Sequence, residues 1–137
     1  MDSAFQVFAV DDDPIVLRAI ERMLRSHSIA VEGFTSPEAF LARPPYDGVA
    51  CLLLDLKMPR LNGFEVLHWL KTQPGLKRLL VIVFSSSAET GDINRAYDLG
   101  ANSYLVKPHA TEQLLELVNR VEKYWLEANQ NPNYLAA

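Results

Sequence analysis

The chain has 137 residues, a length typical of one domain and sufficient to bury a substantial core. Apolar residues make up 49% of the chain, and no apolar run approaches the roughly 20 residues that span a bilayer. The net charge is −4 and the basic residues are dispersed, whereas nucleic-acid binding depends on clustered Lys and Arg. We therefore expect a soluble protein with no membrane or nucleic-acid partner.

The N-terminus and the single cysteine bear on location. Asp2 stands near the start, no cationic segment precedes the first apolar run, and that run ends at Asp11. This pattern does not fit a signal peptide, so a cytoplasmic location is expected. Cys51 cannot form an intrachain disulfide, and its place in the apolar run 49–54 predicts an inert buried thiol.

Short apolar runs alternate with segments of helical period five times along the chain, which predicts an α/β fold with a parallel sheet covered on both faces. The predicted strands are residues 5–10, about 29–34, 49–54, 79–84 and 103–106. The predicted helices begin at Pro14, Pro37, after Asn62-Gly63, near 89 and near 111. Residues 1–128 are expected to form one domain, followed by a polar tail, 129–137, and no output domain.

Two positions carry clear helix-boundary signals. Asp13 precedes Pro14, so we expect it to cap the first helix rather than to act as a third pocket acid. Gly100 is expected to end the fourth helix. The aromatic residues Trp69, Tyr97 and Trp125 are expected to pack in the core, although those on the fourth and fifth helices could also face a partner.

Polar side chains follow four of the predicted strands, at the edge of the sheet where ligands bind in open α/β folds. They are Asp11 and Asp12 after the first strand, Asp55 after the third, Ser85 after the fourth and Lys107 after the fifth. Carboxylates so close together would raise one another's pKa unless a cation lay among them. Oxygen ligands favour Mg²⁺, which also accepts phosphate oxygens.

With a cation offsetting the negative charge, a phosphoryl group could approach Asp55. Its carboxylate could then act as a nucleophile and form an acyl phosphate. Lys107 would pair with one phosphoryl oxygen, and Ser85 would hydrogen-bond another.

These residues resemble the receiver domains of bacterial response regulators over about residues 5–125. The motifs that carry the resemblance are Val10-Asp11-Asp12, Leu54-Asp55-Leu56-Lys57-Met58-Pro59 with Asn62-Gly63, Ser85, and Gly100-Ala101 followed by Lys107-Pro108. The resemblance implies a doubly wound, flavodoxin-like (βα)5 sandwich with strand order 2-1-3-4-5. It also implies a signalling switch that catalyses only its own phosphorylation and dephosphorylation, and is not otherwise an enzyme.

The resemblance assigns further roles by position. Asp11 and Asp12 would form the acidic metal pocket, Asp55 would accept the phosphoryl group, and the backbone carbonyl of Lys57 would complete the metal ligands. Ser85 and Tyr104 would be the switch residues, acting on the surface of the fourth helix, fifth strand and fifth helix. Ser86, Ser87 and Pro108 would lie near the site; Ser87 could affect hydrolysis of the acyl phosphate, and the Lys107-Pro108 bond would be cis.

The segment 97–104 together with 124–126 looks like a narrower set of stand-alone receivers that pair with bacterial phytochrome-type kinases. The implied partners are a sensor histidine kinase, a second copy of the chain through the fourth helix, fifth strand and fifth helix, or a histidine phosphotransfer protein. No motif in the sequence specifies the stimulus, the cognate kinase or the downstream target. The same holds for the oligomeric state and for the lifetime of the phosphorylated state.

Three alternative functions fit the sequence less well. A phosphatase of the haloacid dehalogenase type needs a second Asp two residues after the nucleophile, where this chain has Lys57. A flavodoxin needs a phosphate-binding loop after the first strand, where Asp11 and Asp12 would repel a phosphate. A receiver that binds partners without phosphorylation is disfavoured by the intact Asp55, Ser85 and Lys107. The histidines His27, His68 and His109 stand in no phosphohistidine context and are expected at the surface.

Overall fold

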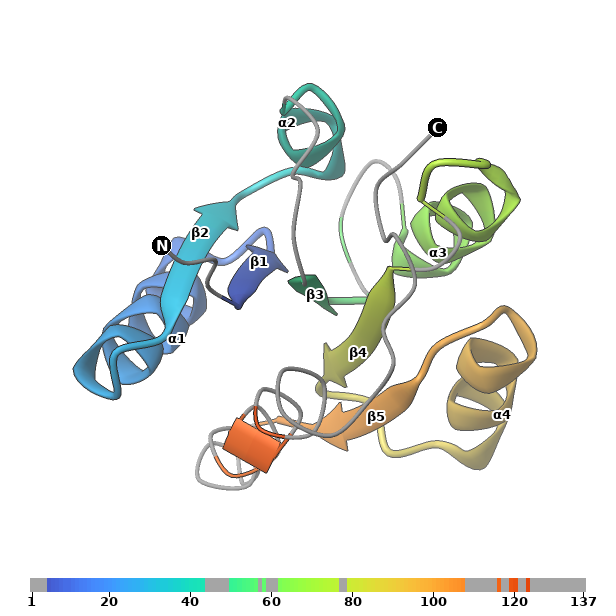
Figure 1. The fold of residues 1–137 in the computed structure, drawn as a ribbon. Coiled ribbons are helices and arrows are strands. Elements are labelled where there is room, and N and C mark those ends of the chain that lie inside the picture. The colour runs from blue at the N-terminus through green and yellow to red at the C-terminus, as the bar shows by residue number, and fades with distance from the viewer. Residues whose placement is uncertain are drawn as a thin grey trace.

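The computed structural model describes residues 5–43, 50–56, 58, 62–76, 79–107, 116, 119, 120 and 123. Its five strands form one parallel sheet in the order β2-β1-β3-β4-β5, which confirms the predicted topology (Figure 1). The strands are β1 (Gln6–Val10), β2 (Ala30–Phe34), β3 (Ala50–Leu54), β4 (Leu80–Ser85) and β5 (Ser103–Val106). Each lies within about one residue of its predicted bounds.

Four helices connect the strands, and the first three begin at residues whose side chains cap them. They are α1 (Pro14–Ser26), α2 (Pro37–Leu41), α3 (Gly63–Thr72) and α4 (Thr90–Asp98). The carboxylate of Asp13 accepts from the Ile15 amide, Ser36 caps α2, and Asn62 forms a capping box with Glu65. Asp13 is thus a helix cap, as predicted, and Gly100 follows α4 with a φ of 108°, a conformation that suits glycine.

The sheet separates two hydrophobic cores, because alternate residues of each strand point to opposite faces. On one face Val7, Ala9 and Leu53 pack against α1. On the other, Phe8 and Val10 pack with residues of α2, α3 and α4. Figure 1 shows α1 on one side of the sheet and α2, α3 and α4 on the other. The predicted fifth helix lies almost wholly outside the described residues, although positions 116, 119, 120 and 123 are helical.

Two aromatic residues lie at the surface: Trp69, which was predicted to pack, and Tyr97, for which a place facing a partner was the stated alternative. Trp69 is 44% exposed and Tyr97 is 48% exposed, because each lies on the outward side of its helix, α3 or α4. The apolar period places Val66 and Leu70 inward on α3, and Trp69 falls outside that stripe. No helix in the described part of the chain is long and apolar enough to cross a bilayer.

The topology places the polar strand ends together. The Asp11 amide donates to the Phe34 carbonyl at 3.1 Å, and the Asp55 amide donates to the Val10 carbonyl at 3.0 Å. These two bonds continue the pairing of β1 with β2 and β3 by one residue. The side chains that follow β1 and β3 therefore start from adjacent points on the same edge of the sheet. At this edge the chain continues from β1 to α1 on one face and from β3 to α3 on the other.

Candidate functional site

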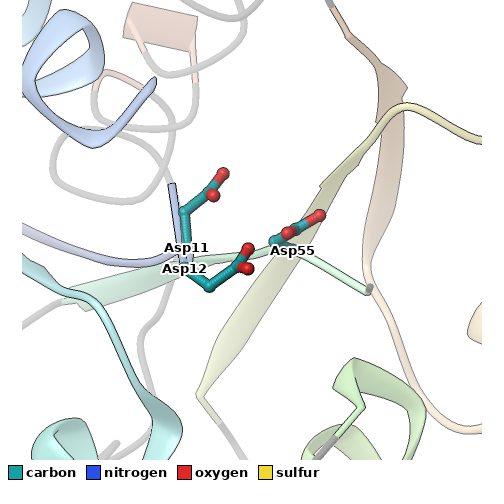
Figure 2. Close-up of side chains that lie close together, drawn as sticks. All are labelled: Asp11, Asp12 and Asp55. Atoms are coloured by element: carbon teal, nitrogen blue, oxygen red, sulfur yellow. The ribbon is translucent and has the colours of Figure 1, made fainter. Parts of the chain in front are cut away.

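Three carboxylates meet at the C-terminal edge of the central strands. Asp11 and Asp12 follow β1 and Asp55 follows β3, and each offers an oxygen such that these oxygens lie within 4.8 Å of one another (Figure 2). Asp11 is 3% exposed and Asp55 is 7% exposed, whereas Asp12 is open to solvent. The site therefore has a buried floor and one exposed acidic side, through which a solute can enter.

The backbone fixes the orientation of Asp11 and the position of Asp55. One carboxylate oxygen of Asp11 accepts a hydrogen bond from the Asp13 amide at 2.9 Å, so the chain that begins α1 also orients this acid. Behind Asp55, the Gly63 amide donates to the Leu56 carbonyl at 2.7 Å. A Cβ at Gly63 would lie 2.6 Å from the Leu56 Cα and against the Asp55 carbonyl oxygen. The start of α3 thus reaches the backbone of Asp55 only because residue 63 has no side chain.

Lys107 follows β5 and brings the positive charge into the site. Its Nζ lies 2.5 Å from Oδ2 of Asp11 and 3.5 Å from Oδ1 of Asp55, and its side chain is 14% exposed. The amide of Lys107 donates to the Ser85 carbonyl at 2.7 Å, which ties the lysine to the end of β4. The ammonium thus contacts Asp11 more closely than Asp55.

The charges of the site leave room for a cation. Among the described residues, the Lys107 ammonium contacts two of the three clustered carboxylates, and such a cluster is unfavourable without further positive charge. The ligand atoms that these three acids offer are carboxylate oxygens, which suit a hard divalent ion such as Mg²⁺, Mn²⁺ or Ca²⁺. The donor set of Asp11, Asp12 and Asp55 therefore fits a divalent metal.

Ser85 and Tyr104 meet through the loop that follows β4. Ser85 is fully buried at the end of β4, and its Oγ accepts a hydrogen bond from the Ser87 amide at 3.1 Å. The hydroxyl of Tyr104, on β5, donates to the Ser87 carbonyl at 2.9 Å. The structure thus connects the two predicted switch residues through Ser87, which is itself buried, whereas Ser86 is exposed.

Several other predictions fall elsewhere. Lys57, Pro108 and His109 lie outside the described residues, as does the peptide bond between Lys107 and Pro108. His27 and His68 are exposed, as predicted. Cys51 is fully buried, as predicted, and burial raises the pKa of its thiol to about 12.

Sequence reasoning missed two residues that support the site. Gly63 was identified only as part of a loop motif, and its close approach to Asp55 depends on where α3 starts. Asp92, in the first turn of α4, accepts a hydrogen bond from the Ser87 hydroxyl at 2.6 Å. The five-residue step from Ser87 to Asp92 matches no capping pattern, so no signal in the sequence could have found this pair.

Comparison with known families identifies the chain. The family model described as response regulator receiver domain matches residues 7–119. The chain therefore belongs to the response regulator receiver domain family. Membership agrees with the strand order and with the acidic edge formed by Asp11, Asp12 and Asp55. It places the chain in two-component signalling and confirms the family resemblance read from the motifs.

The receiver domain has relatives among curated proteins and solved structures. Response regulator Rcp1 of Synechocystis sp. is 40% identical over 76 residues, which cover 56% of this chain and 52% of Rcp1. Response regulator protein TodT of Pseudomonas putida is 34% identical over 125 residues, covering 89% of this chain and 53% of TodT. The chain spans about half the length of the curated relatives it matches.

Two of the similar structures are of phytochrome-related or metal-bound regulators. The phosphorylated cyanobacterial phytochrome response regulator RcpA is 30% identical, with a TM-score of 0.74 over 95% of this receiver domain and 99% of the RcpA chain. The Mn²⁺-bound form of Rcp1 is 29% identical, with a TM-score of 0.69 over 93% of this chain and 98% of that one.

Proposed function

We propose that this receiver domain is a phosphorylation switch in which Asp55 accepts a phosphoryl group. The observation that supports it most is the position of Asp55: it is nearly buried, lies within 4.8 Å of two other carboxylates, and has the Lys107 ammonium 3.5 Å away. A carboxylate in such a site can attack phosphorus, since neighbouring positive charge offsets the repulsion between anions.

The transfer would take place between the carboxylate and a phosphohistidine of a sensor kinase. An Asp55 carboxylate oxygen forms the bond to phosphorus, and the bond between phosphorus and the donor nitrogen breaks. The electron pair of that bond stays on the imidazole nitrogen, and the carboxylate becomes an acyl phosphate. A divalent metal held by these carboxylates, which we propose to be Mg²⁺, would supply charge neutralisation for the phosphoryl oxygens.

The remaining residues have defined tasks in this proposal. Asp11, Asp12 and Asp55 hold the metal, with the Lys57 backbone carbonyl as the further ligand that the family resemblance implies. Lys107 pairs with a phosphoryl oxygen, for which it must exchange part of its contact with Asp11. Ser85 donates its hydroxyl to another phosphoryl oxygen.

The output of the switch follows from the link between Ser85 and β5. Movement of Ser85 toward the phosphoryl group would displace the Ser87 amide that it contacts, and with it the carbonyl bonded to Tyr104. The changed surface would comprise α4, β5 and the predicted fifth helix, and it would serve a partner protein, a phosphotransfer histidine or a second copy of the chain. The protein would thus act as a switch rather than as an enzyme on other substrates.

The proposed kinase is of the phytochrome type. RcpA is a cyanobacterial phytochrome response regulator, and both RcpA and Rcp1 align with this chain over nearly the whole of their solved chains. A cytoplasmic location and a receiver domain within residues 1–128 belong to the same proposal.

The direct test is intact-protein mass spectrometry after incubation with acetyl phosphate. We expect one phosphoryl adduct on the wild type in Mg²⁺, none with chelator, and none on Asp55→Asn. Asp98→Asn, an equivalent change at an exposed position of α4, is the matched control and should be phosphorylated like the wild type. A wild type that stays unmodified under all conditions would instead favour a receiver that binds partners without phosphorylation.

A further inference from the structure

Ser87 connects three elements around the proposed phosphoryl site. Its amide donates to Ser85 Oγ at 3.1 Å, and its carbonyl accepts from the Tyr104 hydroxyl at 2.9 Å. Its own hydroxyl donates to Oδ2 of Asp92 at 2.6 Å and accepts from the Glu89 amide at 3.3 Å. Ser87 is only 8% exposed, and these contacts hold the loop between β4 and α4 in place.

The bond to Asp92 is the strongest of the contacts that the Ser87 side chain makes. Asp92 is the third residue of α4, where the helix dipole favours a negative charge. A separation of 2.6 Å lies in the range of charge-assisted O–H···O⁻ bonds, which are roughly twice as strong as neutral ones. Asp92 therefore anchors the loop to the N-terminus of α4.

The position of the loop determines how the Ser85 hydroxyl can point. A hydroxyl has one proton to donate and two lone pairs that accept. The Ser87 amide occupies one acceptor position of Ser85 Oγ, which restricts the rotation of the hydroxyl and directs its proton away from that amide. The loop thus prepares Ser85 to donate to a third group.

We propose that Asp92 is a positioning residue for the Ser85 hydroxyl, acting through Ser87, and that it couples α4 to the phosphoryl site. The proposal rests on the function proposed above for Asp55 and Ser85. Because coupling of this kind is reciprocal, a phosphoryl group that engages Ser85 must also alter the bond between Ser87 and Asp92. The helix then responds to phosphorylation through Asp92 as well as through Tyr104.

The test compares rates of acyl phosphate formation with acetyl phosphate and Mg²⁺, followed by intact mass. The variants are Asp92→Ala, Asp92→Asn, Ser87→Ala and the Ser87→Ala/Asp92→Ala double variant. Glu89→Ala is the matched control, since it removes a carboxylate from the same helix end and that side chain makes no capping bond. Thermal unfolding of each variant shows that it is folded, and ¹⁵N NMR reports the environment of the Ser87 amide.

We expect Asp92→Ala to slow phosphorylation about tenfold, a factor that equals ~1.4 kcal/mol, and to shift the Ser87 amide resonance. Asp92→Asn should recover most of the rate because its amide oxygen can accept from Ser87, and the double variant should be no slower than the slower single variant. The proposal is overturned if Asp92→Ala matches Glu89→Ala, if Asn gives no rescue, or if the two losses add. If the wild type is phosphorylated on Asp55 but the Asp92 variants behave in one of these ways, only the role of Asp92 is refuted and the proposed function stands. If the wild type is not phosphorylated at all, both the role of Asp92 and the proposed function are refuted.

Discussion

The close approach of α3 to Asp55 predicts that Gly63→Ala destabilises the fold. The new Cβ would lie 2.6 Å from the Leu56 Cα and against the Asp55 carbonyl oxygen, and both contacts are with backbone. No side-chain rotation can relieve them, so the start of α3 and the end of β3 must separate. Among the described glycines only Gly100 has a positive φ, so backbone conformation is not the obstacle at Gly63.

The size of the effect follows from the cost of overpacking a close-packed contact, about 1–3 kcal/mol. For a chain of this length, each kcal/mol lowers Tm by about 4 °C, which gives a fall of roughly 4–12 °C. We expect the same variant to phosphorylate more slowly, since Asp55 must shift with its carbonyl. This loss of stability is expected even though alanine has a higher helix propensity than glycine, which alone would stabilise α3.

Gly91→Ala is the matched control for this prediction. Gly91 also lies in the first turn of a helix, α4, but a Cβ there would meet nothing within 4 Å. Its Tm, measured by circular dichroism, should equal or exceed that of the wild type. If Gly63→Ala were as stable as Gly91→Ala, the inferred contact between α3 and the Asp55 backbone would be refuted.

Two further predictions concern the ends of β4 and the core. Asn102→Ala should lower the free energy of unfolding, measured by urea denaturation, by about 1–3 kcal/mol, because the Asn102 side chain accepts from the amide of the fully buried Val81 at 2.8 Å. Asn102→Asp keeps an oxygen acceptor and should retain most of the stability. Equal stability of the two variants would contradict this role. Burial raises the pKa of Cys51 from 9.0 to about 12, so the native protein should resist a thiol reagent at pH 8 and react fully in urea. The native state binds the Cys51 thiol proton more tightly than the unfolded state, so the stability that this proton contributes should be lost as pH rises from about 9 toward 12. Rapid labelling of Cys51 in the native protein would disprove its burial.

The sheet and the acidic edge could be predicted from sequence because both depend on local pattern. Apolar runs define the strands, and the residue after each run lies at the same edge whatever the details of packing. Asp11, Asp55 and Lys107 were therefore predicted to meet, and the distances between them agree. The cap at Asp13 was equally local, since its carboxylate accepts from an amide two positions away.

What could not be predicted depends on how separate elements meet. The hydrogen bond from Ser87 to Asp92 requires the exact path of a loop, and the need for glycine at position 63 arises from the backbone of another segment. The exposure of Trp69 was missed because residue type favours burial, whereas its place on α3 puts it outside the apolar stripe. Hydrophobicity predicts which residues tend to be buried but not which side of a helix is covered.

The phosphoacceptor can be identified directly by chemical mapping. Borohydride reduces an acyl phosphate on aspartate to homoserine, so protein treated with acetyl phosphate and Mg²⁺, then reduced and digested, carries a mark at the modified position. We predict homoserine at position 55 alone, and none when the metal is chelated. Homoserine at position 11 or 12, or modification of another residue type, would contradict the assignment of Asp55 as the acceptor.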